Sequence, residues 1–213
     1  MGAKTWMLVY SNGNAAESLK KNSVIDRVKT IELVKELFPK EKLESIEDGD
    51  LSYTCPPNNK IYAGYFSGVL VIAAKEFGID FPSKIPIPFL NTDYGNTIQL
   101  HAMHSVVDWL AFAVWNNGSL VRSLSLSPDS GILEDLGEKL DFEIPYWDGK
   151  HPALDPEEDE DSYPFQFHPL DLGEDVLREF FGYVLEGEVD DSLIEPEDII
   201  LLGFRRAPWW KFW

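Results

Sequence analysis

The stretch HAMHSVVDWLAFAVWNNGSLVRSLSLS, from His101 to Ser127, decides the fold that the sequence predicts. It reads as two long strands, rich in β-branched and aromatic residues, that are joined by a tight turn. Asn117 and Gly118 take the two central positions, where a type I′ turn needs positive φ angles. A two-residue connection fixes the register, so we expect a central hairpin over residues 108–127, paired residue by residue out to its ends.

This register assigns each side chain of the hairpin to one face of the sheet, because directly opposed residues share a face. Arg122 is expected opposite Ala113, with Trp109 and Trp115 further along the same face. The small alanine would leave room for the guanidinium to lie against an indole ring. Both faces are largely apolar, so we expect the hairpin in the middle of a sheet that is covered on both sides.

Composition sets the broad class of the protein. Its 213 residues, 44% of them hydrophobic, suffice for one globular domain over residues 1–213 with a full core. Acidic residues number 37 and basic residues 18, which gives a net charge of -19. Most of such a surface would repel phosphate backbones, so we expect no nucleic-acid partner, whereas a cationic partner would be attracted.

Cysteine content and apolar runs bear on location. The one cysteine, Cys55, excludes an internal disulfide framework and a Cys-rich zinc site, and it fits a reducing cytoplasm. The first residues do not resemble a cleavable leader, and the apolar runs are too short to span a membrane. We therefore expect a cytoplasmic protein without a membrane partner.

Periodicity predicts an α+β fold with a mainly antiparallel sheet and two principal helices on one face of it. The helices are expected over 23–38, where Val24 and Val28 belong to the buried stripe, and over 172–185. One helical turn is expected at 133–137. The strands or extended segments are expected at 4–10, 42–47, 61–66, 69–74, 97–100, 142–147 and 199–202.

Two segments stand apart by composition. Residues 155–161 are the most acidic run and are interpreted as a solvated loop. Residues 205–213 form a basic, Trp-rich tail. The tail is expected to pack as a lid on its own chain, and docking on another subunit, which would make an oligomer, is the alternative. The acidic body argues against a membrane surface.

A small polar group at the start of the hairpin is the first candidate site. His104, Asp108 and Ser127 would serve as base, orienting carboxylate and hydroxyl, with Ser123 or Ser125 nearby. The sequence lacks the G-x-S-x-G elbow and a Gly-rich oxyanion loop beside these serines. The preferred interpretation is therefore a hydrogen-bonded polar patch that orients the strand ends.

His101 and His104 are the second candidate, as ligands of a divalent metal together with His151 or His168. In one unbroken strand, positions 101 and 104 lie on opposite faces, and only a bulge between them would let the two imidazoles converge. We therefore expect no metal site here. The sequence also lacks a phosphate-binding loop and a dinucleotide fingerprint, so no cofactor is expected.

Aromatic residues outside the hairpin are the third candidate. Tyr146, Trp147, His168 and Arg122 would line a pocket for a small ligand, since such pockets combine apolar walls with a few polar groups. The structural alternative is a loop that is held to the core by aromatic burial.

Several blocks of the sequence resemble a family of bacterial proteins of unknown function. They are the start MGAKT with Leu8–Tyr10, HAMHSVVDW at 101–109, RSLSLSPD at 122–129, Pro145–Trp147 and Phe167–Leu170. The resemblance runs through Phe204 and leaves the Trp-rich tail outside. Because it implies no activity, it assigns no role to any residue.

The absence of a recognised catalytic motif, with strong charge and many aromatic residues, favours a non-enzymatic protein that binds a protein or small-molecule partner. Two alternatives stay open. One is a small hydrolase or ligand-modifying enzyme centred on His104, Asp108 and Ser127. The other is a divalent-metal protein that uses His101 and His104.

Overall fold

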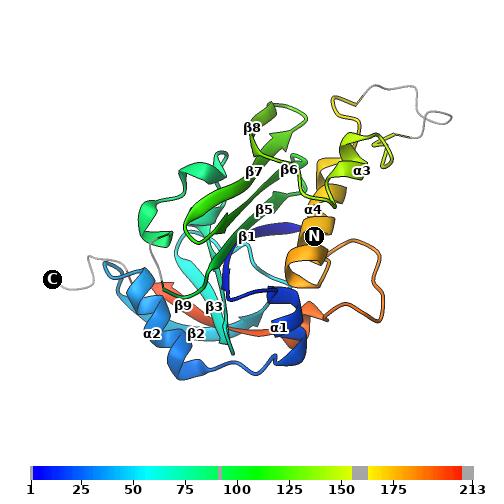
Figure 1. Ribbon diagram of the computed structural model, residues 1–213. Helices are drawn as coiled ribbons and strands as arrows, with labels where there is room; N and C mark the ends of the chain where they lie inside the picture. Colours follow the sequence, from blue (N-terminus) through cyan, green and yellow to red (C-terminus); the bar gives the residue numbers. More distant parts are fainter. Residues whose placement is uncertain (1, 91–92, 155–162, 208–213) are drawn as a thin grey trace.

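The computed structural model describes residues 2–90, 93–154 and 163–207 (Figure 1). Within them, nine strands form one antiparallel sheet in the order β2-β9-β3-β4-β1-β5-β6-β7-β8, which confirms the predicted fold class. The strands are β1 (Lys4–Ser11), β2 (Leu43–Asp50), β3 (Lys60–Phe66), β4 (Val69–Ala74), β5 (Thr97–His104), β6 (Trp109–Asn116), β7 (Ser119–Ser127), β8 (Gly131–Gly137) and β9 (Ile200–Arg206). The helices are α1 (Ala15–Lys21), α2 (Arg27–Leu37), α3 (Ile144–Trp147) and α4 (Pro169–Phe181).

Helices cover both faces of the sheet, so the expectation that the two principal helices share one face is wrong, whereas cover on both sides was expected for the hairpin. Alternate residues of β1 point into different core clusters: Met7 packs with residues of α4, and Leu8 packs with residues of α2. The two helices accordingly lie on opposite sides of the strands (Figure 1). Every residue of β4 is buried, as a strand requires when both of its faces are covered.

The predicted two-residue turn of the hairpin is confirmed. Asn117 and Gly118 have φ angles of 49° and 76°, and Asn116 pairs with Ser119 across them. The register then shifts between Val114 and Trp115, because β7 inserts one extra residue, Val121.

The bulge at Val121 overturns the predicted faces for the rest of β7. Arg122 pairs with Val114, not with Ala113, and its guanidinium carbon lies 6.0 Å from the centre of the Phe112 ring. Arg122 thus lies on the α4 side of the sheet, away from Trp109 and Trp115, which belong to the α2-side cluster.

The strand predicted to run through His101 and Asp108 is two strands. β5 ends at His104, residues 105–108 form a turn, and β6 begins at Trp109. Asp108 has a φ of 45°, in the left-handed region that turns use and strands do not. The expected pair of Asp108 with Ser127 does not form, since Ser127 pairs with Gly131 of β8.

The first predicted helix, over 23–38, is the shorter α2, and α1 precedes it at positions where no helix was predicted. α2 begins after Asp26, whose carboxylate accepts a hydrogen bond from the backbone N of Lys29 at 2.9 Å, and not at Ser23. Val24 and Val28 are 77% and 70% exposed, so they lie outside the buried stripe to which the sequence pattern assigned them.

Four other elements differ from the predictions. The second principal helix is α4, which starts at Pro169 and ends at Gly182, where φ is 76°. The predicted helical turn at 133–137 is the edge strand β8, and the segment predicted as extended at 142–147 ends in the short helix α3. β9 continues through Arg206 into the predicted tail. Residues 208–213 and the acidic run 155–161 lie outside the described residues.

Candidate functional site

A pocket of about 890 Å³ opens at the end of the sheet where β1 begins and β5 ends. One wall is made by the sheet and the loop beside it, and it includes Lys4, Trp6, Cys55 and His104. The other wall is made by the segment 184–197, which connects α4 to β9. The pocket is thus assembled from segments that are far apart in the sequence.

Trp6 anchors the sheet wall. Its backbone N donates to the carbonyl of Thr54 at 2.9 Å, which ties the 51–55 loop to the start of β1. The Nζ atom of Lys75 lies 4.2 Å from the centre of the Trp6 ring. The centres of the Trp6 and His104 rings are 5.9 Å apart. Trp6 is only 8% exposed, and within the described part of the chain its Nε1 has no hydrogen-bond partner.

The second wall is held by hydrogen bonds at both of its ends. Glu174 of α4 accepts from the backbone N of Leu185 at 2.7 Å, and burial raises the pKa of this carboxyl. The backbone N of Ile194 donates to Gly182 at 2.8 Å, and Leu51 N donates to Pro196 at 3.1 Å. These bonds fix the segment against the helix and the 51–55 loop, so the pocket has two defined sides.

Charges of opposite sign line the two walls. The sheet wall carries Lys4, and the segment 184–197 carries Glu186, Glu195 and Glu197. Among the described residues, none of these four side chains forms an ion pair. The pocket therefore presents unpaired charges beside apolar side chains, which is an arrangement that suits a ligand.

Beside Lys4, the sheet wall carries two titratable groups, Cys55 and His104, whose pKa values are shifted in favour of the uncharged form. Burial raises the pKa of the Cys55 thiol, although the charges of Lys4 and Lys75 oppose that shift. Burial, followed by the charge of Lys4, lowers the pKa of His104. A thiol with a raised pKa is a poor nucleophile, because the thiolate is the reactive form.

The three predicted catalytic residues are each engaged elsewhere. His104 Nδ1 accepts from the backbone N of Val106 at 3.2 Å, and Ser127 Oγ accepts from the backbone N of Ser130 at 3.2 Å. Asp108 Oδ2 lies 3.5 Å from His168 Nε2. Across the described ranges, no hydrogen bond joins His104, Asp108 and Ser127 to one another.

The structure instead brings Asp108 together with His168, the residue before α4. His168 Nδ1 accepts from the backbone N of Leu170 at 3.3 Å, so Nε2 carries the proton and points it toward Asp108. Tyr163 stacks on the His168 ring at 5.4 Å between centroids. Burial and then the carboxylate of Asp108 raise the pKa of Tyr163 to about 12. The group connects the 105–108 turn to the start of α4.

His101 is a core histidine that joins β1, β5 and α4. Its Nε2 lies 3.0 Å from the carbonyl of Gly173, which can only accept, so Nδ1 accepts from the hydroxyl of Thr5 at 2.6 Å. Burial lowers the pKa of His101 to about 3. Its side chain faces α4, whereas His104 packs near Trp6 on the other face. Within the described ranges, no group of three or more His, Cys, Asp or Glu side chains is arranged to hold a metal ion.

Tyr146 and Trp147 pack into the α4-side core, away from the pocket. Both rings contact Phe167, at 5.5 and 5.1 Å between centroids. The Tyr146 hydroxyl donates to Asp175 at 2.7 Å, and His151 stacks on the Tyr146 ring at 4.3 Å. These contacts match the structural alternative, in which aromatic burial holds the segment to the core.

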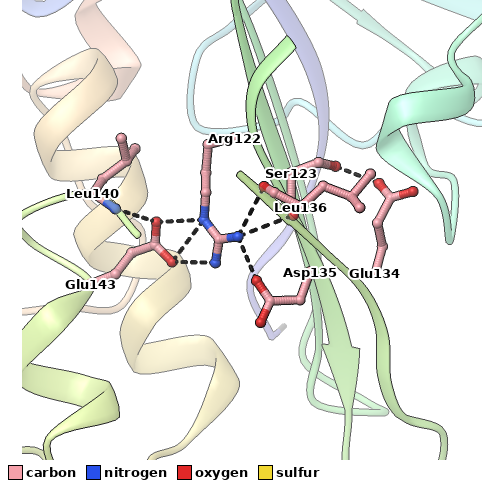
Figure 2. A network of polar contacts seen from close by, with 7 residues as sticks. All are labelled: Arg122, Ser123, Glu134, Asp135, Leu136, Leu140 and Glu143. Carbon is pink, nitrogen blue, oxygen red and sulfur yellow. Dashed lines mark hydrogen bonds and ion pairs between the residues drawn. The ribbon is translucent and has the colours of Figure 1, made fainter. Parts of the chain in front are cut away.

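Arg122 is fully buried in a network that joins β7 to β8 and to the segment before α3 (Figure 2). Its guanidinium donates to Glu143 at 2.7 Å, and Glu143 is also 0% exposed. A second bond reaches Asp135 at 2.5 Å, and Glu143 further accepts from Leu140 N at 2.9 Å. Burial opposes the charge of Arg122, yet the hydrogen bonds to Glu143 and Asp135 raise its pKa. Its four partners in Figure 2 are Glu143, Asp135 and the backbone carbonyls of Ser123 and Leu136, so the guanidinium bonds within the chain and not to a pocket.

Residues 5–204 match the model of a protein family of unknown function, DUF6928. The chain belongs to this family. The match spans nearly the whole described structure and ends at Phe204, within β9, as the resemblance in the sequence indicated. No curated protein and no solved structure matches the chain. None of the helices in the described ranges of this DUF6928 member has the length and apolar character that crossing a membrane requires.

Reasoning from the sequence missed most of this pocket. His104 was singled out, but Lys4, Trp6 and the segment 184–197 were not. A signal was present in the apolar residues of a loop that also carries many acidic ones, namely Val189, Leu193 and Ile194. Apolar residues in such a loop indicate a buried or ligand-facing side.

Proposed function

We propose that this protein is a non-enzymatic binding protein and that the pocket between the start of β1 and the segment 184–197 takes a small-molecule partner. The observation that supports this most is the size and form of the pocket. Its volume of about 890 Å³ falls in the range of roughly 300–1,000 Å³ typical of small-molecule sites. Its walls combine apolar side chains with a few charged ones.

The chemistry of the wall favours binding over catalysis. Hydrolysis by covalent catalysis needs a nucleophile within hydrogen-bond reach of a base. The thiol of Cys55 has a raised pKa, and the hydroxyl of Ser127 is used by the backbone of Ser130. The hydrolase hypothesis at His104, Asp108 and Ser127 therefore has less support.

Titration with the fluorescent dye 8-anilinonaphthalene-1-sulfonate tests whether the pocket binds apolar molecules. Ile194 lines the pocket, and Ile194→Trp places a large ring in it. Ile132, which is 47% exposed on the edge strand β8 and outside the pocket, provides the matched variant Ile132→Trp. We expect saturable dye binding that Ile194→Trp weakens tenfold or more and that Ile132→Trp leaves unchanged.

Two results would contradict the proposal. One is the absence of saturable dye binding, or an equal response of both tryptophan variants, with circular dichroism confirming that the variants fold. The other is hydrolysis of p-nitrophenyl acetate or p-nitrophenyl phosphate that His104→Ala abolishes, because it would make the protein an enzyme.

A further inference from the structure

We propose that the pocket binds a zwitterionic ligand with an apolar body, namely a short apolar peptide whose amino and carboxyl termini are both free. This inference rests on the proposed function, since it names the ligand class of the same pocket. The observation behind it is the sorting of charge between the walls, with a basic side chain on the sheet wall and acidic ones on the segment 184–197.

The charges of the pocket are available to a ligand because they do not neutralise one another. Lys4 and the three glutamates line one cavity, yet in the part of the chain that the structure describes no salt bridge joins them. Elsewhere in this strongly acidic chain, Arg122, Arg178 and Arg206 all pair with carboxylates. An ammonium on the glutamate side and a carboxylate near Lys4 would complement both walls at once.

Trp6 adds an independent sign that an acceptor belongs on the sheet wall. Its indole Nε1 is buried and, among the described residues, has no hydrogen-bond partner. A buried donor without an acceptor is costly, and native proteins rarely keep one. The Nζ atom of Lys75 over the same ring makes this part of the wall more positive. Because Nε1 is covered in this structure, a ligand carboxylate oxygen would satisfy the donor after the side chains around it move aside, on a wall where Lys4 favours negative charge.

The middle of the pocket fits an apolar body. Val184, Leu193, Ile194 and Tyr53 contribute to its lining, and Tyr53 and Val189 are 49% and 68% exposed. Apolar groups of this size at a concave opening favour burial of an apolar ligand surface. A volume near the upper end of the small-molecule range leaves room for several residues of peptide.

Calorimetric titration with trileucine and its blocked forms tests the ligand class on the full-length protein. The four probes are trileucine with free termini, N-acetyl-trileucine, trileucine amide and the doubly blocked peptide. We expect the free peptide to bind, and blocking either terminus to weaken binding about tenfold, since each block removes a charge-assisted contact.

Variants of each wall separate the two termini. Lys4→Met should remove the preference for the free acid over the amide and keep the preference for the free amine. The triple variant Glu186→Gln, Glu195→Gln, Glu197→Gln should do the reverse. Lys21→Met and Glu138→Gln are matched controls at exposed positions outside the pocket, and both should leave all four affinities unchanged.

The outcomes distinguish this inference from the proposed function. If the dye binds in the pocket and no form of trileucine does, the ligand class is wrong and the binding function stands. If free and blocked peptides bind equally well, the apolar body alone is recognised and the inference fails. The inference would also fail if Lys4→Met and the triple variant each lost the preference for the free acid and the preference for the free amine equally. The two walls would then not bind different termini.

Discussion

Charged side chains are arranged in opposite ways in two regions of this sheet, the strands β7 and β8 at one edge and the start of the middle strand β1. Around Arg122, on β7 and β8, the charges of Arg122 and Glu143 are fully buried, and their hydrogen bonds end on other groups of the same chain (Figure 2). At the start of β1, Lys4 and three glutamates share a cavity without pairing. A buried charge that is fully paired stabilises one arrangement of the fold, whereas an unpaired charge in a cavity is available for binding.

The largest expected effect tests the region of paired charges around Arg122. Glu143→Gln keeps the shape of the side chain but leaves Arg122 as a buried charge without its main partner. Breaking a buried pair in this way costs about 3–5 kcal/mol of stability. Urea unfolding of the variant and the wild type measures the difference. Asp48→Asn, which removes the exposed partner of Arg27, is the control and should cost under about 1 kcal/mol. Similar losses in the two variants would contradict the assignment.

His101 predicts a pH dependence that belongs to the fold and not to the pocket. Its pKa is about 3 in the folded protein and about 6.5 when unfolded, so the unfolded chain binds the extra proton between these values. Stability is therefore lost as pH falls from about 6.5 toward 3, by about 1.4 kcal/mol per pH unit. Relative to His101→Gln, the wild type should lose roughly 2–3 kcal/mol by pH 4.5.

Unfolding of both proteins by urea at pH 7 and pH 4.5 measures this difference, and carboxylates that titrate in the same window cancel in the comparison. A wild type and a His101→Gln variant that respond identically to pH would show that His101 is not held neutral.

A smaller effect on stability is expected for Ser123, which lies beside Arg122 on β7. Its hydroxyl donates to Glu134, which also accepts from the backbone N and the hydroxyl of Ser83, at 2.9 and 2.5 Å. Ser123→Ala removes one of these bonds and should cost about 1 kcal/mol. Ser130→Ala, at an exposed position, should cost much less when both are measured by thermal unfolding. An unchanged Tm for Ser123→Ala would mean that the hydrogen bond from Ser123 to Glu134 does not stabilise the fold.

The smallest effects are expected at the pocket. Lys4→Met and Glu195→Gln remove charges that have no ion-pair partner among the described residues, so each should change stability by no more than about 0.5 kcal/mol. Chemical unfolding of each variant in the absence of ligand provides the measurement. A loss of stability close to that of Glu143→Gln would mean that these side chains stabilise the fold. The contrast between the pocket and the region around Arg122 would then disappear.

Local signals in the sequence predicted the turns and the most apolar strands. Asn117-Gly118 connects the predicted hairpin, and Ser67-Gly68 connects β3 to β4 in the same way, with positive φ angles that suit few other residues. The fold class followed from these turns. The Pro169 signal for the start of α4 was present in the sequence and was not used, so the helix was predicted three residues late.

Features that depend on distant partners were not predicted. Arg122 was expected against an indole ring, but the face that it takes depends on the extra residue Val121, and its partner is Glu143, 21 residues away. The same holds for β8, whose acidic side chains find their partners only through Arg122, Ser123 and Ser83. The pocket was predicted least well, because its walls come from both ends of the chain and no local pattern in the sequence brings them together.

Val121 has a consequence for reading other members of the family. It is the extra residue that makes Arg122, Leu124 and Leu126 face α4 and leaves the serines between them on the opposite face. A relative that lacks one residue between the Asn-Gly turn and the arginine would have to exchange the whole alternation of leucine and serine along the strand. Among relatives, the number of residues between the turn and the arginine should therefore vary together with the positions of the leucines and serines that follow.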